Sequence, residues 1–241
     1  MNRIGIVVAL CFLYASVGWR YRELVEPEYA ADALLWGLWV VMTGAIAWRF
    51  RLVEDGSLML VAAAGGFVIE WWGTNTNLWH YFTSERPPVW IVPAWPVATI
   101  VIDRMRQLSG HWLSRLAFGY WAILPAFVVM MTSFAWPTID VFATRVVVAL
   151  MIAVVCVRPR PQHDVTLFVC GSLLGILLEY WGTSRQCWTY YTGEVPPPEA
   201  VFAHGFASVA FGRAHQILEP LWAALRTLTG GQPGRMRVSA Q

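Results

Sequence analysis

Apolar residues gather along the chain into eight stretches, at residues 4–18, 31–48, 57–72, 89–102, 113–133, 139–157, 165–181 and 199–212. A helix that crosses the hydrocarbon core of a bilayer needs about 20 residues, and about 17 is the practical minimum. The pattern therefore predicts an all-α transmembrane bundle of about eight membrane segments. The fourth and eighth stretches are short. They either continue into the polar residues that follow or form half-helices that re-enter the membrane.

The same pattern occurs twice. A shift that aligns Glu70 with Glu179 keeps a gapless register through Arg104 and Arg213. This register predicts two tandem membrane repeats, 1–109 and 110–218, followed by a cytoplasmic C-terminal tail, 219–241. Each repeat contains four stretches, so we expect parallel halves around an axis along the membrane normal, with a site between them. The identical pairs include Trp72/Trp181, Gly73/Gly182, Thr74/Thr183, Trp79/Trp188, Tyr81/Tyr190, Thr83/Thr192, Glu85/Glu194, Pro87/Pro196 and Pro88/Pro197.

The composition suits lipid as the solvent. Hydrophobic residues make up 57% and charged residues 13%, against about 25% charged in an average soluble domain. The 17 basic residues are all arginine, and twelve fall on one side of the eight expected crossings against five on the other. This asymmetry predicts both termini on the cytoplasmic side of a bacterial or archaeal inner membrane. A net charge of +2 gives no sign of a nucleic-acid partner.

Two further features refine the class of protein. The four cysteines form no C-x-x-C pair, so we expect free thiols and no metal site. The first apolar stretch lacks a small-x-small cleavage site, so we interpret it as a membrane segment and not as a signal peptide. Small residues four apart, Ala62/Gly66 and Gly171/Gly175, predict close helix packing.

Glu70 and Glu179 are the main candidates for chemistry. Each lies about 13 residues inside an apolar helix, about 20 Å from its cytoplasmic end. An ionisable residue at that depth indicates function. An apolar pocket favours the protonated carboxyl, which could then donate a proton at neutral pH. We expect the two acids to face one shared cavity. The alternative is that each carboxylate only ties down the loop that follows it.

Polar and aromatic residues follow each acid, and we predict that they line a hydrophobic substrate. Aromatic faces attract positive charge, by about 0.5–2 kcal/mol each. Some of these rings could instead anchor the protein at the membrane interface. The predicted binding residues are Trp72, Trp79, Tyr81, Trp181, Trp188, Tyr190, Asn75, Thr74 and Thr183.

The two copies differ at the site. Arg185 stands where the first copy has Thr76, and His204 stands where it has Trp95. We expect Arg185 to pair with Glu179 and ionise it, which leaves Glu70 as the protonated partner. His204 is either a fourth catalytic group or a hydrogen-bonded scaffold. No Asp-rich diphosphate-binding motif is present in the sequence. Protonation therefore remains as the expected chemistry, and it needs no metal or other cofactor.

The stretch Glu70-Trp-Trp-Gly-Thr-Asn-Thr76 resembles the membrane-embedded carotenoid-biosynthesis proteins that include the carotenoid hydratases. In that family a Glu is followed by Gly and Thr, and then by aromatic positions. The match covers about a dozen residues, and the second copy departs from it at Arg185. The two-repeat layout is also similar in outline to membrane lycopene cyclases. The resemblance implies acid-initiated hydration or cyclisation of a long isoprenoid.

Two other functions remain open at this point. A small-solute or lipid transporter or channel would place the paired glutamates at its midplane and need a path to both sides of the membrane. A non-catalytic membrane assembly subunit would have fully satisfied acids and no cavity. The lipid bilayer and a hydrophobic isoprenoid are the expected partners, with a homo-oligomer possible.

Overall fold

The computed structural model describes residues 3–20 and 33–228. Three of the 17 arginines counted for the charge asymmetry, Arg22, Arg235 and Arg237, lie outside the described residues, as does the tail beyond residue 228.

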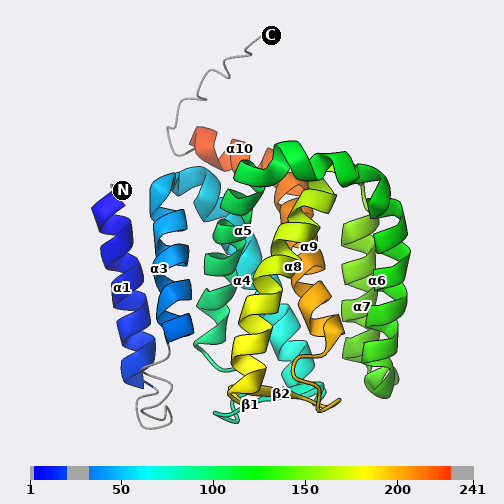
Figure 1. Cartoon of the computed structure of the whole chain (residues 1–241). Helices are drawn as coiled ribbons and strands as arrows, with labels where there is room; N and C mark the ends of the chain where they lie inside the picture. Colours follow the sequence, from blue (N-terminus) through cyan, green and yellow to red (C-terminus); the bar gives the residue numbers. More distant parts are fainter. Residues whose placement is uncertain (1–2, 21–32, 229–241) are drawn as a thin grey trace.

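Helices dominate the described chain, which confirms the predicted all-α class. The described part of each apolar stretch lies mainly in one helix, and a two-stranded ribbon is added to the helices (Figure 1). The α-helices are α1 (Arg3–Arg20), α3 (Ala33–Trp48), α4 (Leu52–Asn75), α5 (Ile91–Leu113), α6 (Tyr120–Ala135), α7 (Phe142–Cys156), α8 (Pro161–Ser184), α9 (Pro198–Ile217) and α10 (Glu219–Leu228). Two 3₁₀ helices, η1 (Ser114–Gly119) and η2 (Trp136–Thr138), flank α6, and the strands are β1 (Trp79–Tyr81) and β2 (Trp188–Tyr190).

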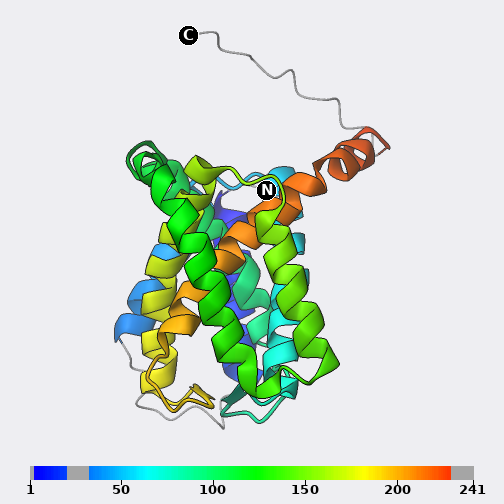
Figure 2. The same ribbon diagram turned by 90° about the vertical axis from the view of Figure 1, so that its right-hand side faces the viewer.

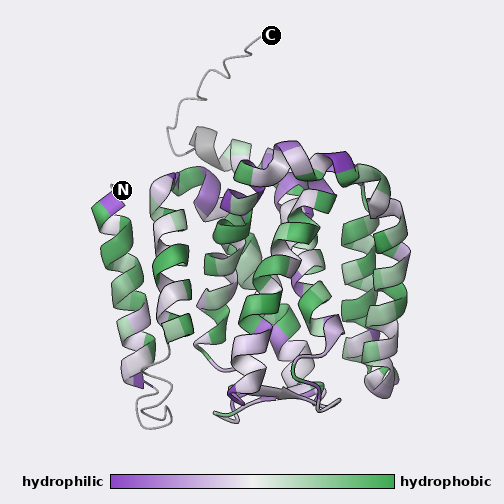
Figure 3. Cartoon of the chain, in the orientation of Figure 1, coloured by the Kyte–Doolittle hydropathy of each residue, from purple (hydrophilic) through white to green (hydrophobic). Residues whose placement is uncertain are grey.

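Within residues 3–20 and 33–228, four helical segments are long and apolar enough to cross a membrane, and α3 and α7 are shorter apolar helices. Figure 3 shows hydrophobic residues along the helices and hydrophilic ones gathered at the ends of the bundle. Such helices are compatible with a membrane protein. The four segments are Arg3–Arg20, Leu52–Asn75, Ile91–Thr138 and Pro161–Ser184.

The short fourth and eighth stretches form complete helices and not half-helices. α5 has 23 residues and α9 has 20, because both continue through the polar residues that follow each apolar stretch. Pro93 lies in the first turn of α5, where the missing N–H has no partner to lose, and Pro96 follows one turn later.

The helices α4, α5, α8 and α9 form the centre of the bundle, with α1 and α3 on one flank and α6 and α7 on the other (Figure 1). Figure 2 shows α10 continuing from the end of α9 away from the bundle. The tightest pair is α8 with α9. A Cβ added to Gly171 would lie 2.8 Å from the carbonyl oxygen of His204, and one added to Gly205 would lie 2.7 Å from that of Phe168. Backbone therefore contacts backbone, as the small-residue spacing predicted.

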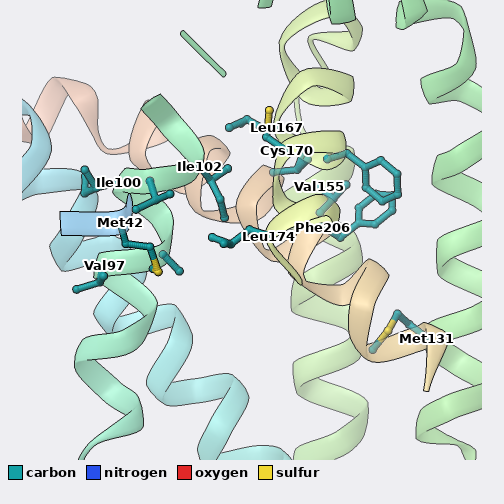
Figure 4. Packing of buried hydrophobic residues seen from close by; sticks show 14 of the residues in the cluster. Met42, Val97, Ile100, Ile102, Met131, Val155, Leu167, Cys170, Leu174 and Phe206 are labelled. Carbon is teal, nitrogen blue, oxygen red and sulfur yellow. The ribbon is translucent and has the colours of Figure 1, made fainter. Parts of the chain in front are cut away.

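Apolar side chains fill the space between the central helices and join them to the flank. Figure 4 shows Ile102 of α5 on the side of Leu174 of α8, and Ile100 on the side of Met42 of α3. Phe206 of α9 stacks on Phe127 of α6, with ring centroids 3.6 Å apart.

A buried ion pair ties each central helix pair together at the end opposite the ribbon. Arg104 Nη2 of α5 donates to Asp55 Oδ2 of α4, and Arg213 of α9 donates to Asp164 of α8 in the same way. Each aspartate also accepts a backbone N–H from the start of its own helix, at Arg51 and at Arg160. Negative charge at a helix N-terminus is stabilised by the helix dipole.

Candidate functional site

Glu70 lies near the C-terminal end of α4 and is only 4% exposed. Its Oε2 accepts hydrogen bonds from Trp79 Nε1 at 3.0 Å and from the hydroxyl of Tyr81 at 2.7 Å. Its Oε1 accepts one from Trp95 Nε1 of α5 at 3.0 Å. Both carboxylate oxygens are therefore occupied by donors that carry no charge.

Glu179 lies at the equivalent place in α8 and is equally buried. Its Oε2 accepts from Trp188 Nε1 at 2.9 Å and from the hydroxyl of Tyr190 at 3.0 Å. Its Oε1 lies 2.8 Å from Nε2 of His204 on α9. The two donor sets differ only at this last member, where His204 stands in place of Trp95 in the register that aligns Glu70 with Glu179.

The chain reverses directly after each glutamate helix, and this turn brings the donors back. Asn77 adopts a positive φ of 59°, and the N–H of Leu78 donates to the carbonyl of Gly73 at 2.9 Å. Asn tolerates this left-handed conformation better than most residues. Trp79 then folds over Gly73, where an added Cβ would lie 1.9 Å from the indole ring. Glycine is required at that position because the ring occupies the space of a side chain.

The two strands bring the donors of both glutamates together. β1 pairs antiparallel with β2, with Trp79 opposite Tyr190 and Tyr81 opposite Trp188. Across the ribbon, the Trp79 and Tyr190 rings are 6.0 Å apart and the Tyr81 and Trp188 rings 5.9 Å apart. Sequence reasoning missed this ribbon. The alternation of aromatic and polar residues in Trp-His-Tyr and Trp-Thr-Tyr was its signal, but three residues are too few to establish a period.

The tyrosines of the ribbon stay protonated donors. Burial raises the pKa of Tyr81 well above its ordinary value, and the neighbouring negative charge of Glu70 raises it further. Burial and Glu179 raise the pKa of Tyr190 in the same direction. Each hydroxyl therefore keeps the proton that it donates to its glutamate.

The donors on α5 and α9 meet between the two carboxylates. The rings of Trp95 and His204 stack at 5.3 Å between centroids, with their planes at 17°. A glycine makes room for each ring. Gly66 lies against Trp95 and Gly175 against His204, and an added Cβ would lie within 2.3 Å and 2.8 Å of the respective side chain. The stacked rings link the two carboxylate sites into one buried unit.

The other predicted site residues lie around this unit without contacting either carboxylate group. Thr74 and Thr183 donate to the backbone carbonyls of Glu70 and Glu179. Trp72 donates to Thr144 of α7 at 2.9 Å, Asn75 donates to a backbone carbonyl at the exposed end of α4, and Trp181 lies half-buried on α8.

Arg185 requires a correction. The sequence predicted that its guanidinium would pair with Glu179, but the structure places it against the hydroxyl of Ser184 and the ring of Trp181. Arg185 follows Glu179 by six residues, which puts the two side chains on different faces at the end of a helix with 3.6 residues per turn. The position next to Glu179 belongs to His204 instead.

Neither of the two most prominent cavities in the described chain is lined by Glu70 or Glu179, so neither is the shared cavity that the sequence predicted for the two acids. One of about 530 Å³ lies on α6 beside Trp136, and one of about 200 Å³ lies among the central helices at the ion-pair end. Within residues 3–20 and 33–228, His, Cys, Asp and Glu form no group of three that could hold a metal ion.

Comparison with known proteins identifies no relative of the chain. No protein-family model, curated protein or solved structure matches the chain. The two carboxylates with their tryptophan, tyrosine and histidine donors therefore carry the functional argument by their own geometry.

Proposed function

We propose that the chain is an integral membrane enzyme that protonates a hydrophobic, carotenoid-like isoprenoid and so starts a cyclisation or a hydration. The contact between Glu179 Oε1 and His204 Nε2, at 2.8 Å inside the buried unit, carries this proposal. Such a contact requires one proton, on the ring nitrogen or on the carboxyl oxygen. A neutral imidazole meets this requirement with its Nε2–H alone, so the acid that we propose is the pair with one further proton, on Nδ1 of His204 or on the carboxyl group.

The aromatic surroundings favour the same chemistry. The proton adds to one carbon of the double bond and leaves a positive charge on the other. Rings packed around the two carboxylates, among them Trp79, Tyr81, Trp188 and Tyr190, can attract such a charge through their faces. Cyclisation then ends with loss of a proton from a neighbouring carbon. Hydration ends with capture of water and loss of one of its protons.

We assign different roles to the two glutamates. Glu70 is held by three uncharged donors and acts as a positioning residue. Glu179 and His204 form the acid. His204 is 17% exposed at its side chain, and its Nδ1 has no hydrogen bond within the described chain, so this edge of the ring is open to a substrate or to water. The sequence resemblance around Glu70 supports the isoprenoid class.

The membrane arrangement is part of the proposal. Two tandem repeats would cross the bilayer eight times, with both termini and the arginine-rich end of the bundle on the cytoplasmic side of an inner membrane. Equal lengths of α4 and α8, 24 residues each, support this arrangement. The equivalent ion pairs at Asp55 and Asp164 also support it.

One observation favours a second candidate, a non-catalytic assembly subunit. Each glutamate already takes part in three hydrogen bonds, as a structural carboxylate would. On this alternative the unit would only lock the ribbon onto the helices.

A lipid comparison separates the two candidates. A bacterial host with a carotenoid pathway would express the wild type, Glu179→Gln or the exposed-loop control Glu194→Gln at matched membrane levels. The enzyme predicts a product isomeric with its precursor, or heavier by one water, in the wild type and control. Glu179→Gln abolishes that product. Identical lipid masses with and without the wild-type protein would favour the assembly subunit.

A further inference from the structure

A polar cavity of about 200 Å³ lies between α4, α5, α8 and α9 at the end of the bundle opposite the ribbon. All four central helices contribute to its wall. Charged and titratable residues around it include Arg51, Glu54, Asp103, Arg106, His163 and His215.

The charges in the wall are mostly paired with each other. Arg106 donates twice to Asp103, at 2.7 and 3.0 Å, and Arg51 lies 3.8 Å from Glu54. The wall therefore offers no excess of one sign to select an anion or a cation. It offers hydrogen-bonding groups on several sides, which is what water needs. A volume of about 200 Å³ has room for several waters.

The floor of the cavity reaches toward the acid. Thr99 and Ser208 line the floor from α5 and α9. Ser208 follows His204 by four residues, about 6 Å along the helix, and its hydroxyl donates to the carbonyl of His204 at 2.7 Å. Ser208 therefore stands one helical turn along α9 from the backbone of His204, on the side of the cavity.

A second observation extends this polar line. The hydroxyl of Ser172 is buried without a hydrogen-bond partner in the described chain, and the residue is only 7% exposed. It lies against Gly205, the residue after His204. An unpaired buried hydroxyl marks a place for an ordered water. Ser208 and Ser172 therefore place two hydroxyls along the α8–α9 contact, between the cavity and His204.

We infer that this cavity is a water-filled vestibule. Protons from the water at the arginine-rich end of the bundle pass through it and return to the His204–Glu179 pair. The inference rests on the proposed function. After the pair gives its proton to the substrate, it is one proton short. A hydronium ion in the vestibule returns that proton, and the proton released later by the substrate cation goes back to water. The ligand of the site is therefore water with its excess proton.

Exchange of the imidazole C2 hydrogen for deuterium, followed by mass spectrometry of the purified full chain in D₂O, tests this route. The other four of the five histidines in the chain serve as internal references. His80 and His111 are exposed, and His163 and His215 line the cavity. We expect His204 to exchange within about tenfold of the two cavity histidines, because the same water reaches it.

Filling the vestibule gives the decisive comparison. Gly212 lies in its wall, and a Cβ there would lie 2.9 Å from the flexible end of Leu167 and 3.9 Å from Cε1 of His163. Gly212→Leu is expected to slow exchange at His204 about fivefold or more and to leave His80 and His111 unchanged. Gly110→Leu is the matched control, because nothing lies within 4 Å of a Cβ at that position. Thr99→Ile fills the floor from the opposite helix if Gly212→Leu does not fold.

Two results would overturn the inference. One is a His204 that does not exchange while His163 and His215 do, because the water would then stop short of the acid. The other is an exchange rate at His204 that stays unchanged in both Gly212→Leu and Thr99→Ile, because the water would then reach His204 by another route. Exchange needs no substrate, so a failed lipid comparison would refute the proposed function without altering this result.

Discussion

Trp95 and His204 stack on each other with their ring planes at 17°, and each bonds through a ring nitrogen to a different buried glutamate. They occupy equivalent positions in the two halves of the chain. An indole N–H only donates, whereas an imidazole can gain and lose a proton near neutral pH. This single difference between the donor sets gives the second half a group that can carry a proton.

The stacked pair predicts a measurable loss of stability when either donor is removed. Trp95→Phe and His204→Phe each leave one carboxylate oxygen without its partner, at a cost of about 1–3 kcal/mol in the free energy of unfolding. His204→Gln keeps a donor and should lose less. Unfolding in detergent would measure all three, with the exposed Trp121→Phe as control. Equal stability of His204→Phe and the wild type would contradict the role of this contact.

The glycines under the ribbon tryptophans predict a clash. Gly73→Ala and Gly182→Ala place a Cβ about 2 Å from the rings of Trp79 and Trp188, which are themselves held by the glutamates. Overpacking of this kind typically costs about 1–3 kcal/mol. Gly110→Ala, in open space on a helix, should instead be neutral or stabilising. Thermal unfolding of the three variants tests this prediction. A Gly73→Ala variant as stable as the wild type would show that the Trp79 ring moves easily.

The buried pair of Asp55 and Arg104 predicts strong coupling. Removing one partner leaves an uncompensated buried charge and costs about 3–5 kcal/mol. Arg104→Met should therefore be far less stable than the double variant Asp55→Leu with Arg104→Met. A double-mutant cycle on the amount of folded protein in membranes measures this. Additive losses would mean that the two charges act independently.

The raised pKa of Tyr81 and Tyr190 predicts alkaline destabilisation. Both groups bind their protons more tightly in the folded protein, so their contribution is complete below the ordinary tyrosine pKa of about 10 and is lost as the pH rises above it. Above that pKa, each tyrosine lowers the free energy of unfolding by about 1.4 kcal/mol per pH unit. The free energy of unfolding of the wild type and of Tyr81→Phe, measured from about pH 9 to about pH 11, tests this prediction. Identical slopes would contradict it.

The sequence predicted the helices and the two glutamates because long apolar runs and buried acids leave strong signals. It could not predict which groups reach the acids. His204 is 25 residues from Glu179, and only the packing of α9 on α8 places it there, whereas Arg185 is near in sequence but on another face. The ion pairs did leave a signal in the sequence. Asp55 and Arg104 recur in the second copy, in the same register, as Asp164 and Arg213.

The most direct test of the proposed acid is the origin of the proton that the product carries. Membranes with the wild-type protein would convert the isoprenoid in D₂O, and the product would be analysed by mass spectrometry. A proton held between Glu179 and His204 exchanges with solvent, so the account predicts one deuterium bound to carbon in each product molecule. Glu179→Gln membranes should form no such product. A product that forms in D₂O without carbon-bound deuterium would contradict protonation by this pair.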